Sequence, residues 1–437
     1  MSFRVPGMLA AVALAVAILP VQAQTEIQWW HSMTAVNGEW VADLAKEFNA
    51  SQKDYKVVPT FKGTYDESMT AAIAAFRAGG GPQILQVFEV GTATMMASKK
   101  AIVPVGQMMK AAGYKFDPSV YIPAVASYYT SPSGEMLSFP FNSSTTVFYY
   151  SKDAFKRAGL DPARAPATWP EVMAAAAKLK VAGEKCAYSS GWQSWVHLEN
   201  FSAWHNVTFA NKNNGFDGTD ARLTFNSPLH EKHIANMADW MKKGYFSYGG
   251  RTNEAESKFF SGECAMLTSS SAAYANIKKN AKFDWAVSPL PYYREVAGAP
   301  QNTIIGGASL WVMGGKPAAD YKGVAKFFTF LSEPNRQAAW HQATGYLPIS
   351  AAAYEVTKKS GFYEKNPGTD VSVKQMIEKN VTASSRGLRL GNFVQIRAIV
   401  DEELEGVWAG KQSAKAALDN AVKRGNEQLE KFQAANK

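Results

Sequence analysis

Short apolar runs alternate with amphipathic stretches through the first part of the chain. The run "EIQWWH" precedes the amphipathic "EWVADLAKEFNAS", and "YKVVPTF" precedes "YDESMTAAIAAFRAGG". This pattern predicts strands that alternate with helices of ten to fifteen residues. Thr64 with Glu67 predicts a capping box at the start of the second helix, and Gly79 predicts its end. The alternation therefore predicts βαβ units in a mostly parallel sheet that helices cover on both faces.

The same alternation starts again in the middle of the chain. "TTVFYY" predicts a strand and "PATWPEVMAAAAKLK" predicts a helix that opens near a proline. Near the end, "SAKAALDNAVKRGNEQLEKF" predicts an amphipathic helix with Ser413 as its cap. Two α/β blocks joined by few long linkers predict two lobes that meet at a cleft.

The first 23 residues predict a secretory signal peptide. Arg4 supplies the positive start, "MLAAVALAVAIL" is an apolar run too short to span a bilayer, and "VQA" offers a cleavage site after Ala23. No later stretch approaches the roughly 20 unbroken apolar residues of a spanning helix. We therefore expect a soluble, exported chain in the periplasm.

Net charge and cysteine content bear on the possible partners and on disulfide pairing. The 437 residues carry a formal net charge of +9, but Lys and Arg are scattered among Asp and Glu. This mixing favours a solvated surface and argues against a nucleic-acid partner. Cys186 and Cys264 are the two cysteines. In an oxidising compartment they can pair, but the sequence alone leaves pairing and two buried thiols both open.

Catalytic and metal-binding signatures are missing from the sequence. "GGASLWVMGGKP" lacks the spacing of a phosphate-binding loop, and no nucleophile elbow or dinucleotide fingerprint occurs. His230 and His233 in "HEKH" stand one helical turn apart without a third ligand, so we expect a solvated helix face there. We interpret the other histidines as structural, namely His31, His197, His205 and His341. The sequence predicts no metal, no cofactor and no enzyme.

The stretch "SSGWQSWVHLENFSAW", residues 189–204, holds three tryptophans in sixteen positions. Tryptophan is large and needs a partner for its indole N–H, so this density is unusual for packing alone. The residues by themselves allow a core segment or an aromatic wall for a ligand.

Several stretches taken together resemble the extracellular solute-binding proteins of ABC importers, in the maltodextrin-binding branch. They include "QVFEVGTATMMASK", "PFNSSTTVFYY", "ENFSAW", "IIGGASLWVM", "TGYLPI" and "RGLRLGNFVQIR", in matching order over almost the whole chain. The resemblance is strongest to members that bind phosphorylated glycerol compounds. It implies a two-lobed α/β fold that closes over sn-glycerol 3-phosphate or a glycerophosphodiester such as glycerophosphocholine. The partners that it implies are the membrane subunits of an ABC permease with its cytoplasmic ATPase.

The resemblance also implies lobe boundaries and ligand contacts. Lobe 1 would comprise residues 24–139 and 285–339, and lobe 2 residues 140–284 and 340–437. The implied ligand contacts are Tyr65, Glu89, Ser144, Trp192, Trp195, Ser270, Gly307, Tyr346 and Arg397.

The implied contacts make physical sense for a glycerol phosphate. Arg397 can direct two N–H groups onto a phosphate, and Gly307 lets a backbone N–H approach closely. Glu89 can accept the glycerol hydroxyls, while Trp192 and Trp195 form a wall for its carbon face. We leave Trp204 to the core. Because one guanidinium and neutral donors suit a monoanion best, we expect a glycerophosphodiester to bind at least as well as the monoester.

Two alternatives stay open at this point. The same fold can hold a malto-oligosaccharide or another sugar, which would require several carboxylates and amides. A secreted phosphodiesterase would need His, Asp and Glu clustered around metals, a pattern not seen in the sequence.

Overall fold

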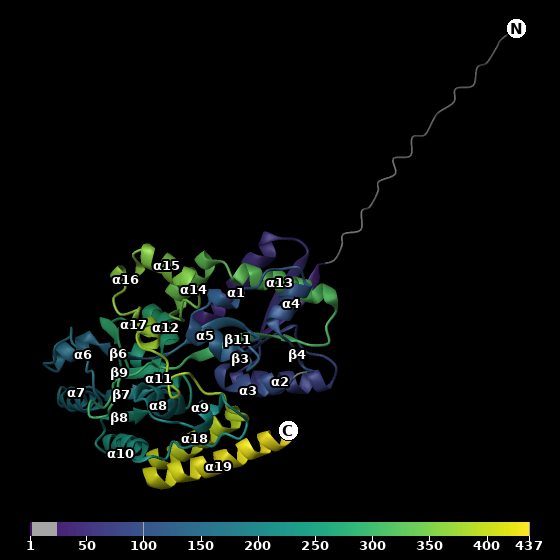
Figure 1. Cartoon of the computed structure of the whole chain (residues 1–437). Helices are drawn as coiled ribbons and strands as arrows, with labels where there is room; N and C mark the ends of the chain where they lie inside the picture. Colours follow the sequence, from purple (N-terminus) through teal and green to yellow (C-terminus); the bar gives the residue numbers. More distant parts are fainter. Residues whose placement is uncertain (2–23, 99, 437) are drawn as a thin grey trace.

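The structure of the protein is a computed structural model that describes Met1 and residues 24–98 and 100–436. The predicted signal peptide, residues 1–23, therefore lies outside the described residues except for Met1. Within the described part, the chain forms two sheets that helices surround (Figure 1).

The first sheet has six strands in the order β2-β1-β3-β11-β4, with β5 also paired to β11. β1 runs parallel to β2 and β3, whereas β11 runs antiparallel to β3, β4 and β5. The strands are β1 (Thr25–His31), β2 (Tyr55–Phe61), β3 (Ile84–Phe88), β4 (Ile102–Val103), β5 (Phe139–Ser144) and β11 (Gly306–Met313).

The second sheet has five strands in the order β10-β6-β9-β7-β8. β7 runs parallel to β8 and β9, and β6 runs antiparallel to β9 and β10. The strands are β6 (Thr146–Ser151), β7 (Cys186–Ser190), β8 (Phe246–Tyr248), β9 (Cys264–Ser270) and β10 (Trp285–Ser288).

Helices make up most of the remaining described chain. In the first half they are α1 (Ala35–Ser51), α2 (Tyr65–Arg77), α3 (Thr92–Ala97), α4 (Val105–Ala111), α5 (Pro123–Tyr129), α6 (Lys152–Arg157), α7 (Trp169–Val181), α8 (Phe201–Trp204) and α9 (Asn211–Gly215). In the second half they are α10 (Pro228–Lys242), α11 (Glu254–Phe260), α12 (Tyr274–Asn280), α13 (Ala318–Leu331), α14 (Pro334–Thr344), α15 (Ala351–Lys359), α16 (Phe362–Lys365), α17 (Val371–Ile377), α18 (Phe393–Trp408) and α19 (Ala414–Ala435). Three short 3₁₀ helices span Glu89–Gly91, Pro118–Val120 and Ser271–Ala273. Residues Trp195–Asn200 form a π-helix.

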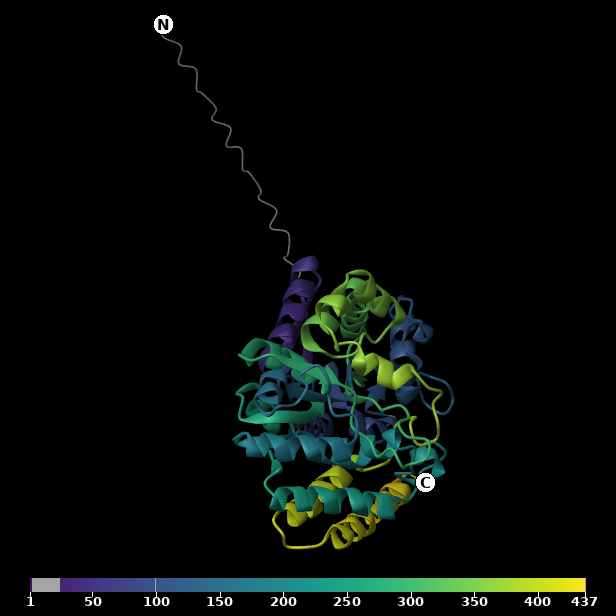
Figure 2. The same ribbon diagram turned by 90° about the vertical axis from the view of Figure 1, so that its left-hand side faces the viewer.

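Each sheet with its helices forms one lobe. Around the first sheet, α1, α4 and α13 lie on one face and α2 and α3 on the other (Figure 1). Beside the second sheet, α18 and α19 pack on each other and on α10, forming a helical layer along one side of the molecule (Figure 2). The predicted two-lobed α/β fold is confirmed.

Local signals placed several helix ends correctly. The Thr64 hydroxyl accepts a hydrogen bond from the Glu67 N–H, and the Glu67 carboxylate accepts one from the Thr64 N–H, which completes the predicted capping box. Gly79 follows α2 with a φ of +77°, and Ser413 caps α19.

The sheets are mixed rather than mostly parallel. The strands that join the lobes, β5 followed directly by β6 and later β10 followed by β11, pair antiparallel with their neighbours. They connect two sheets instead of belonging to one βαβ unit, so the handed crossover that makes neighbours parallel does not apply to them.

The strand pairing bears on the lobe boundaries, which otherwise stay a prediction. The first crossing falls at Thr145, between β5 and β6, close to the predicted Pro140. The predicted return near Trp285 is early, because β10 pairs with β6 in the second sheet, with Trp285 opposite Ser151. The chain rejoins the first sheet only at β11. Trp340, the third predicted crossing, still packs in the first lobe's core.

Cys186 and Cys264 form a disulfide, which settles the alternative that the sequence left open. They stand opposite each other at the starts of the paired strands β7 and β9. Among the described residues, no helix combines the length and the apolarity of a membrane span.

Candidate functional site

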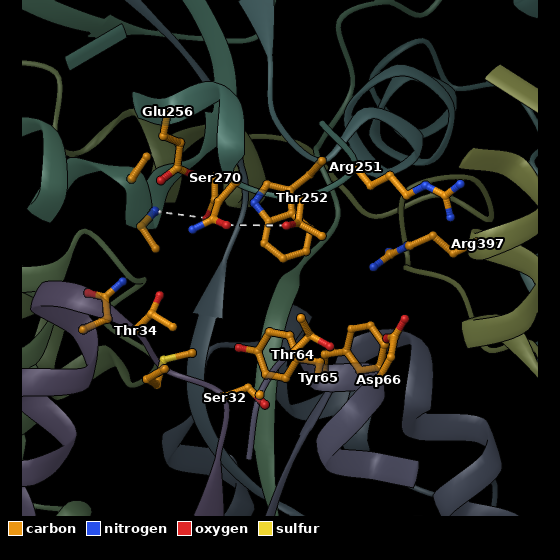
Figure 3. Close-up of a pocket in the computed structure, with 18 of the residues that line it drawn as sticks. Ser32, Thr34, Thr64, Tyr65, Asp66, Arg251, Thr252, Glu256, Ser270 and Arg397 are labelled. Carbon is orange, nitrogen blue, oxygen red and sulfur yellow. Dashed lines mark hydrogen bonds between the residues drawn. The ribbon is translucent and has the colours of Figure 1, made fainter. Parts of the chain in front are cut away.

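A cavity of about 270 Å³ lies between the two lobes. Its walls begin where strands of both sheets end, since Ser32 and Met33 follow β1, Phe88 ends β3 and Ser270 ends β9. Ligands of open α/β sheets bind outside the carboxyl ends of the strands, so this position is typical of a binding site. Figure 3 shows side chains from both lobes directed toward one another across this space.

The lining divides between the lobes. The first lobe contributes Ser32, Met33, Thr34, Asn37, Phe61, Gly63, Thr64, Tyr65, Asp66 and Phe88, and Tyr346 packs beside them. The second lobe contributes Trp192, Ser194, Arg251, Thr252, Asn253, Glu256, Ser270, Ala272, Ala273, Asn276, Val394, Arg397, Ala398 and Asp401.

Tyr65 is the first residue of α2, directly after the capping residue Thr64. Its ring stacks on Phe88 with centroids 5.1 Å apart and an interplanar angle of 7°. Its hydroxyl accepts a hydrogen bond of 3.1 Å from the Asn142 side chain. Capping, stacking and hydrogen bonding together fix this tyrosine at the edge of the cavity.

Arg397 is held by two buried carboxylates. Its Nη2 donates to Glu89 Oε1 and to Glu199 Oε2, each at 2.6 Å, and its Nε donates to Glu199 Oε1 at 2.9 Å. The three residues are 8%, 6% and 3% exposed, in the order Arg397, Glu89, Glu199. Burial raises the pKa of Glu89, and the nearby guanidinium opposes that rise. One guanidinium thus faces two carboxylates, so the cluster keeps a formal negative charge.

Two of the carboxyl groups that line the cavity, Asp401 and Glu256, have pKa values near neutrality. Burial raises the pKa of Asp401 to about 7, against the opposing effect of Arg397. Asp401 Oδ1 has no hydrogen-bond partner among the described residues. Burial also raises the pKa of Glu256 to about 7, although Ser269 donates a 2.8 Å hydrogen bond to it. Both groups therefore titrate near neutrality.

The tryptophans of residues 189–204 take three different positions. Trp192 lines the cavity and has a φ of +51°, held by a 2.7 Å hydrogen bond from its backbone N–H to the Thr252 carbonyl. Trp195 is 4% exposed and packs against Gly306, where a Cβ would stand 2.3 Å from its ring. The indole N–H of Trp204 donates to the Leu290 carbonyl at 2.8 Å, which confirms its place in the core.

The remaining predicted contacts are near the cavity to different degrees. Tyr346 lines the cavity and stacks on Trp340. Ser270 also lines the cavity, and its hydroxyl accepts a hydrogen bond of 3.1 Å from the Ala272 N–H. Ser144 and Gly307 lie instead in the β5–β11 pairing, behind the lining. Gly307 has a φ of +80°, and a Cβ there would stand 1.9 Å from the Asn142 carbonyl oxygen. Close strand packing thus requires this glycine.

The structure therefore brings Tyr65, Trp192, Ser270, Tyr346 and Arg397 together around one cavity. Glu89 reaches this group through its bond to Arg397.

Several lining or supporting residues were not predicted. Glu199 holds Arg397, and Arg251 lines the cavity while donating to Glu405 through Nε at 2.8 Å and Nη2 at 2.6 Å. Asp401 also lines the cavity, one helical turn after Arg397, which is buried and pairs with Glu89 and Glu199. Glu199 stood within the tryptophan-rich stretch, so a carboxylate amid aromatic residues was the available signal.

The expectation of a solvated face at His230 and His233 is wrong. Both side chains are fully buried. His233 lies 3.1 Å from the His197 ring nitrogen and stacks on Phe201, and His230 lies 2.8 Å from the Ser202 hydroxyl. α10 turns this face toward the core of the second lobe, and burial lowers the pKa of these histidines. Within the described residues, no group of three or more His, Cys, Asp and Glu is arranged to hold a metal ion.

Comparisons with known proteins agree with this architecture. The profile of the bacterial extracellular solute-binding proteins matches residues 43–369. The chain is 56% identical over 429 residues to the sn-glycerol-3-phosphate-binding periplasmic protein UgpB of Pectobacterium atrosepticum, covering 98% of this chain and 96% of that protein. It is 58% identical over 416 residues to the UgpB of Yersinia pseudotuberculosis, covering 95% and 94%.

The fold also resembles a solved structure. The crystal structure of UgpB from Mycobacterium tuberculosis in complex with glycerophosphocholine superposes with a TM-score of 0.78 at 22% identity, covering 93% of this chain and 99% of that one. The profile match, the full-length identities and the two lobes around a cavity agree. The chain belongs to the bacterial extracellular solute-binding protein family.

Proposed function

We propose that this protein is the periplasmic binding component of an ABC importer that captures sn-glycerol 3-phosphate and glycerophosphodiesters. It delivers the ligand to the membrane permease subunits. The observation that carries the proposal is the 56% identity, over almost the full length, to proteins named for sn-glycerol-3-phosphate binding. The cavity between the lobes supports it, because a two-lobed binder encloses its ligand there.

The lining offers a role for each part of such a ligand. Arg397 and the hydroxyls of Tyr65, Tyr346 and Ser270 are proposed to donate to the phosphate oxygens. Trp192 provides a flat apolar surface for the carbon face of glycerol, and Trp195 supports that surface from behind. Ser144 and Gly307 complete the proposed set if lobe movement exposes the β5–β11 edge to the ligand.

Glu89 is proposed to accept the glycerol hydroxyls. When the phosphate binds Arg397, the Glu89 carboxylate would lose the hydrogen bond from Arg397 and accept hydrogen bonds from the glycerol hydroxyls instead. A buried carboxylate tolerates this exchange only if new donors replace the old one, and the glycerol hydroxyls provide them.

A sugar ligand is the second candidate, and one observation favours it. The lining includes carboxylates and amides suited to sugar hydroxyls, namely Asp66, Glu256, Asp401, Asn37, Asn253 and Asn276. Because Glu89 and Glu199 already neutralise Arg397, its presence alone does not demand an anion.

A thermal-shift panel separates the two candidates. sn-Glycerol 3-phosphate and glycerophosphocholine should raise the melting temperature in a concentration-dependent way, and maltose and trehalose should not. A shift with a sugar and none with either phosphate compound would reject the proposal.

We propose capture without chemistry on the ligand. The relatives are named as binding proteins. Glycerophosphocholine incubated with the protein and added divalent metal ions should release no choline, and release above the protein-free control would support the phosphodiesterase alternative.

A further inference from the structure

Glu199 lies on the π-helix Trp195–Asn200 and is buried beside Arg397, which lines the cavity. π-Helical turns are rare and occur often at functional sites. The segment is fixed at its end, because the Asn200 side chain donates to the Trp195 carbonyl at 3.3 Å and accepts from the Ile304 N–H at 3.0 Å. Glu199 is therefore presented from a rigid base.

The contact between Glu199 and Arg397 is two-pronged. Oε1 accepts from Nε at 2.9 Å and Oε2 accepts from Nη2 at 2.6 Å, so one edge of the guanidinium is occupied. Nη1, at the other edge, makes no hydrogen bond with the described residues. Arg397 lines the cavity, and its guanidinium end points into it (Figure 3). Nη1 is thus the donor available to a ligand in this structure, because Nη2, on the same edge, also donates to Glu89.

The two glutamates on Arg397 differ in the lobe that carries them. Glu199 and Arg397 both belong to the second lobe, whereas Glu89 follows β3 of the first sheet. A relative movement of the lobes would separate Arg397 from Glu89 and leave its bonds to Glu199 unchanged. Glu199 is therefore the permanent partner, and Glu89 shares Nη2 only when the lobes are close.

We infer that Glu199 is a positioning residue for ligand capture, which holds Arg397 by its Nε–Nη2 edge so that Nη1 is directed at the ligand phosphate. This inference rests on the proposed function. A free arginine side chain has several rotatable bonds, and fixing it before binding removes an entropic cost from the binding step. Glu199 itself need not contact the ligand.

A double-mutant cycle tests the inference. Calorimetry measures the Kd for sn-glycerol 3-phosphate of the wild type, Glu199→Gln, Arg397→Met and the double variant. Glu199→Gln keeps the shape of the side chain and removes its charge, so we expect roughly tenfold or greater weakening. In the Arg397→Met background, the same change should alter the Kd by less than about twofold, because Glu199 acts only through Arg397.

A matched control distinguishes positioning from general stabilisation. Glu403 is also buried on α18, and it accepts a 2.7 Å hydrogen bond from Arg424 of α19, outside the cavity lining. Glu403→Gln removes an ion pair of the same helix that lies outside the cavity, although its arginine is more exposed, and its Kd should match the wild type within about twofold. If Glu199→Gln does not fold, Glu199→Asp, which keeps the charge but shortens the reach, should fold and still weaken binding.

Two results would overturn the inference while leaving the proposed function intact. One is a Glu199→Gln Kd within twofold of the wild type. The other is equal weakening by Glu199→Gln with and without Arg397. If the folded wild type shows no binding of sn-glycerol 3-phosphate, the proposed function fails and the inference fails with it.

Discussion

The carboxylate of Glu89 and the guanidinium of Arg397 meet across the boundary between the lobes, with Oε1 and Nη2 2.6 Å apart. Both side chains are less than a tenth exposed. A buried ion pair contributes little net stability, because desolvation offsets much of its attraction, but breaking it without replacement is costly. A ligand that provides both an anion for Arg397 and hydroxyl donors for Glu89 replaces both halves at once. We therefore expect the pair to act as a selective element of the cleft if the proposed ligand contacts are right.

The charge of the ligand's phosphate should matter. Arg397 is the cation proposed to meet the phosphate, and Glu89 and Glu199 already share it, so a second negative charge on the phosphate would be compensated even less than the first. A phosphate monoester gains its second charge with a pKa near 6, whereas a diester keeps one charge. We therefore predict that the affinity for sn-glycerol 3-phosphate, relative to glycerophosphocholine, falls between pH 5.5 and 8. Calorimetry with both ligands at each pH checks this, and a constant ratio would contradict it.

Asp401 should make the protein less stable as the pH rises. Its pKa is about 7 in the folded protein against an ordinary value of 3.8. The favourable contribution of the protonated group is complete below pH 3.8 and is lost as the pH approaches 7. The side chain introduced by Asp401→Asn does not titrate, so the variant should not lose this stability. Between pH 4 and pH 8 its unfolding free energy, relative to that of the wild type, should therefore rise by up to about 4 kcal/mol. Urea unfolding at the two pH values measures it, and equal pH dependence would refute the assignment.

The buried histidines of the second lobe should make the protein sensitive to acid. Burial lowers the pKa of His233 well below its ordinary 6.5, and His197 and His230 fall to about 3. The unfolded chain takes up protons below pH 6.5 while the folded chain does not, so stability falls as the pH drops. Each histidine contributes about 1.4 kcal/mol per pH unit in that range. On the acid side, the unfolding free energy of His233→Gln should therefore fall less steeply with decreasing pH than that of the wild type, by about this amount. A slope equal to that of the wild type would contradict the prediction.

The disulfide should affect stability without affecting binding. Cys186 and Cys264 stand at the starts of β7 and β9, while Trp192 follows the end of β7 and Ser270 ends β9. Replacing both cysteines with serine should cost about 2–4 kcal/mol in unfolding free energy. The Kd for sn-glycerol 3-phosphate should stay within about twofold. A large loss of affinity in a folded variant would instead show that the Cys186–Cys264 disulfide holds the binding residues at the ends of β7 and β9 in place.

Local signals were enough to predict much of the fold. The capping box at Thr64, the cap at Ser413 and the alternation of apolar runs each act within a few residues, so their outcome is visible in the sequence. The mixed direction of the sheets was missed, because pairing between β6 and β10, or β5 and β11, joins segments far apart in the chain.

The lining residues Tyr65 and Ser270 were predicted as ligand contacts because the family resemblance implies them. The local pattern predicts the start of a helix near Tyr65, but it does not by itself assign either residue to a binding site. Glu199 was missed because its partner, Arg397, is 198 residues away, and spacing gives no hint of their contact. The environment of His233 was missed for a similar reason, since it comes from His197 on the π-helix Trp195–Asn200 and Phe201 on α8.

The central claim is that Arg397 anchors a glycerol phosphate in the cleft. Titration calorimetry of sn-glycerol 3-phosphate into the wild type and Arg397→Met tests it most directly, with the melting temperature confirming that both are folded. We predict saturable binding at one site in the wild type and a Kd weaker by tenfold or more in the variant. Equal affinity of the two proteins, or the absence of binding to the folded wild type, would contradict the claim.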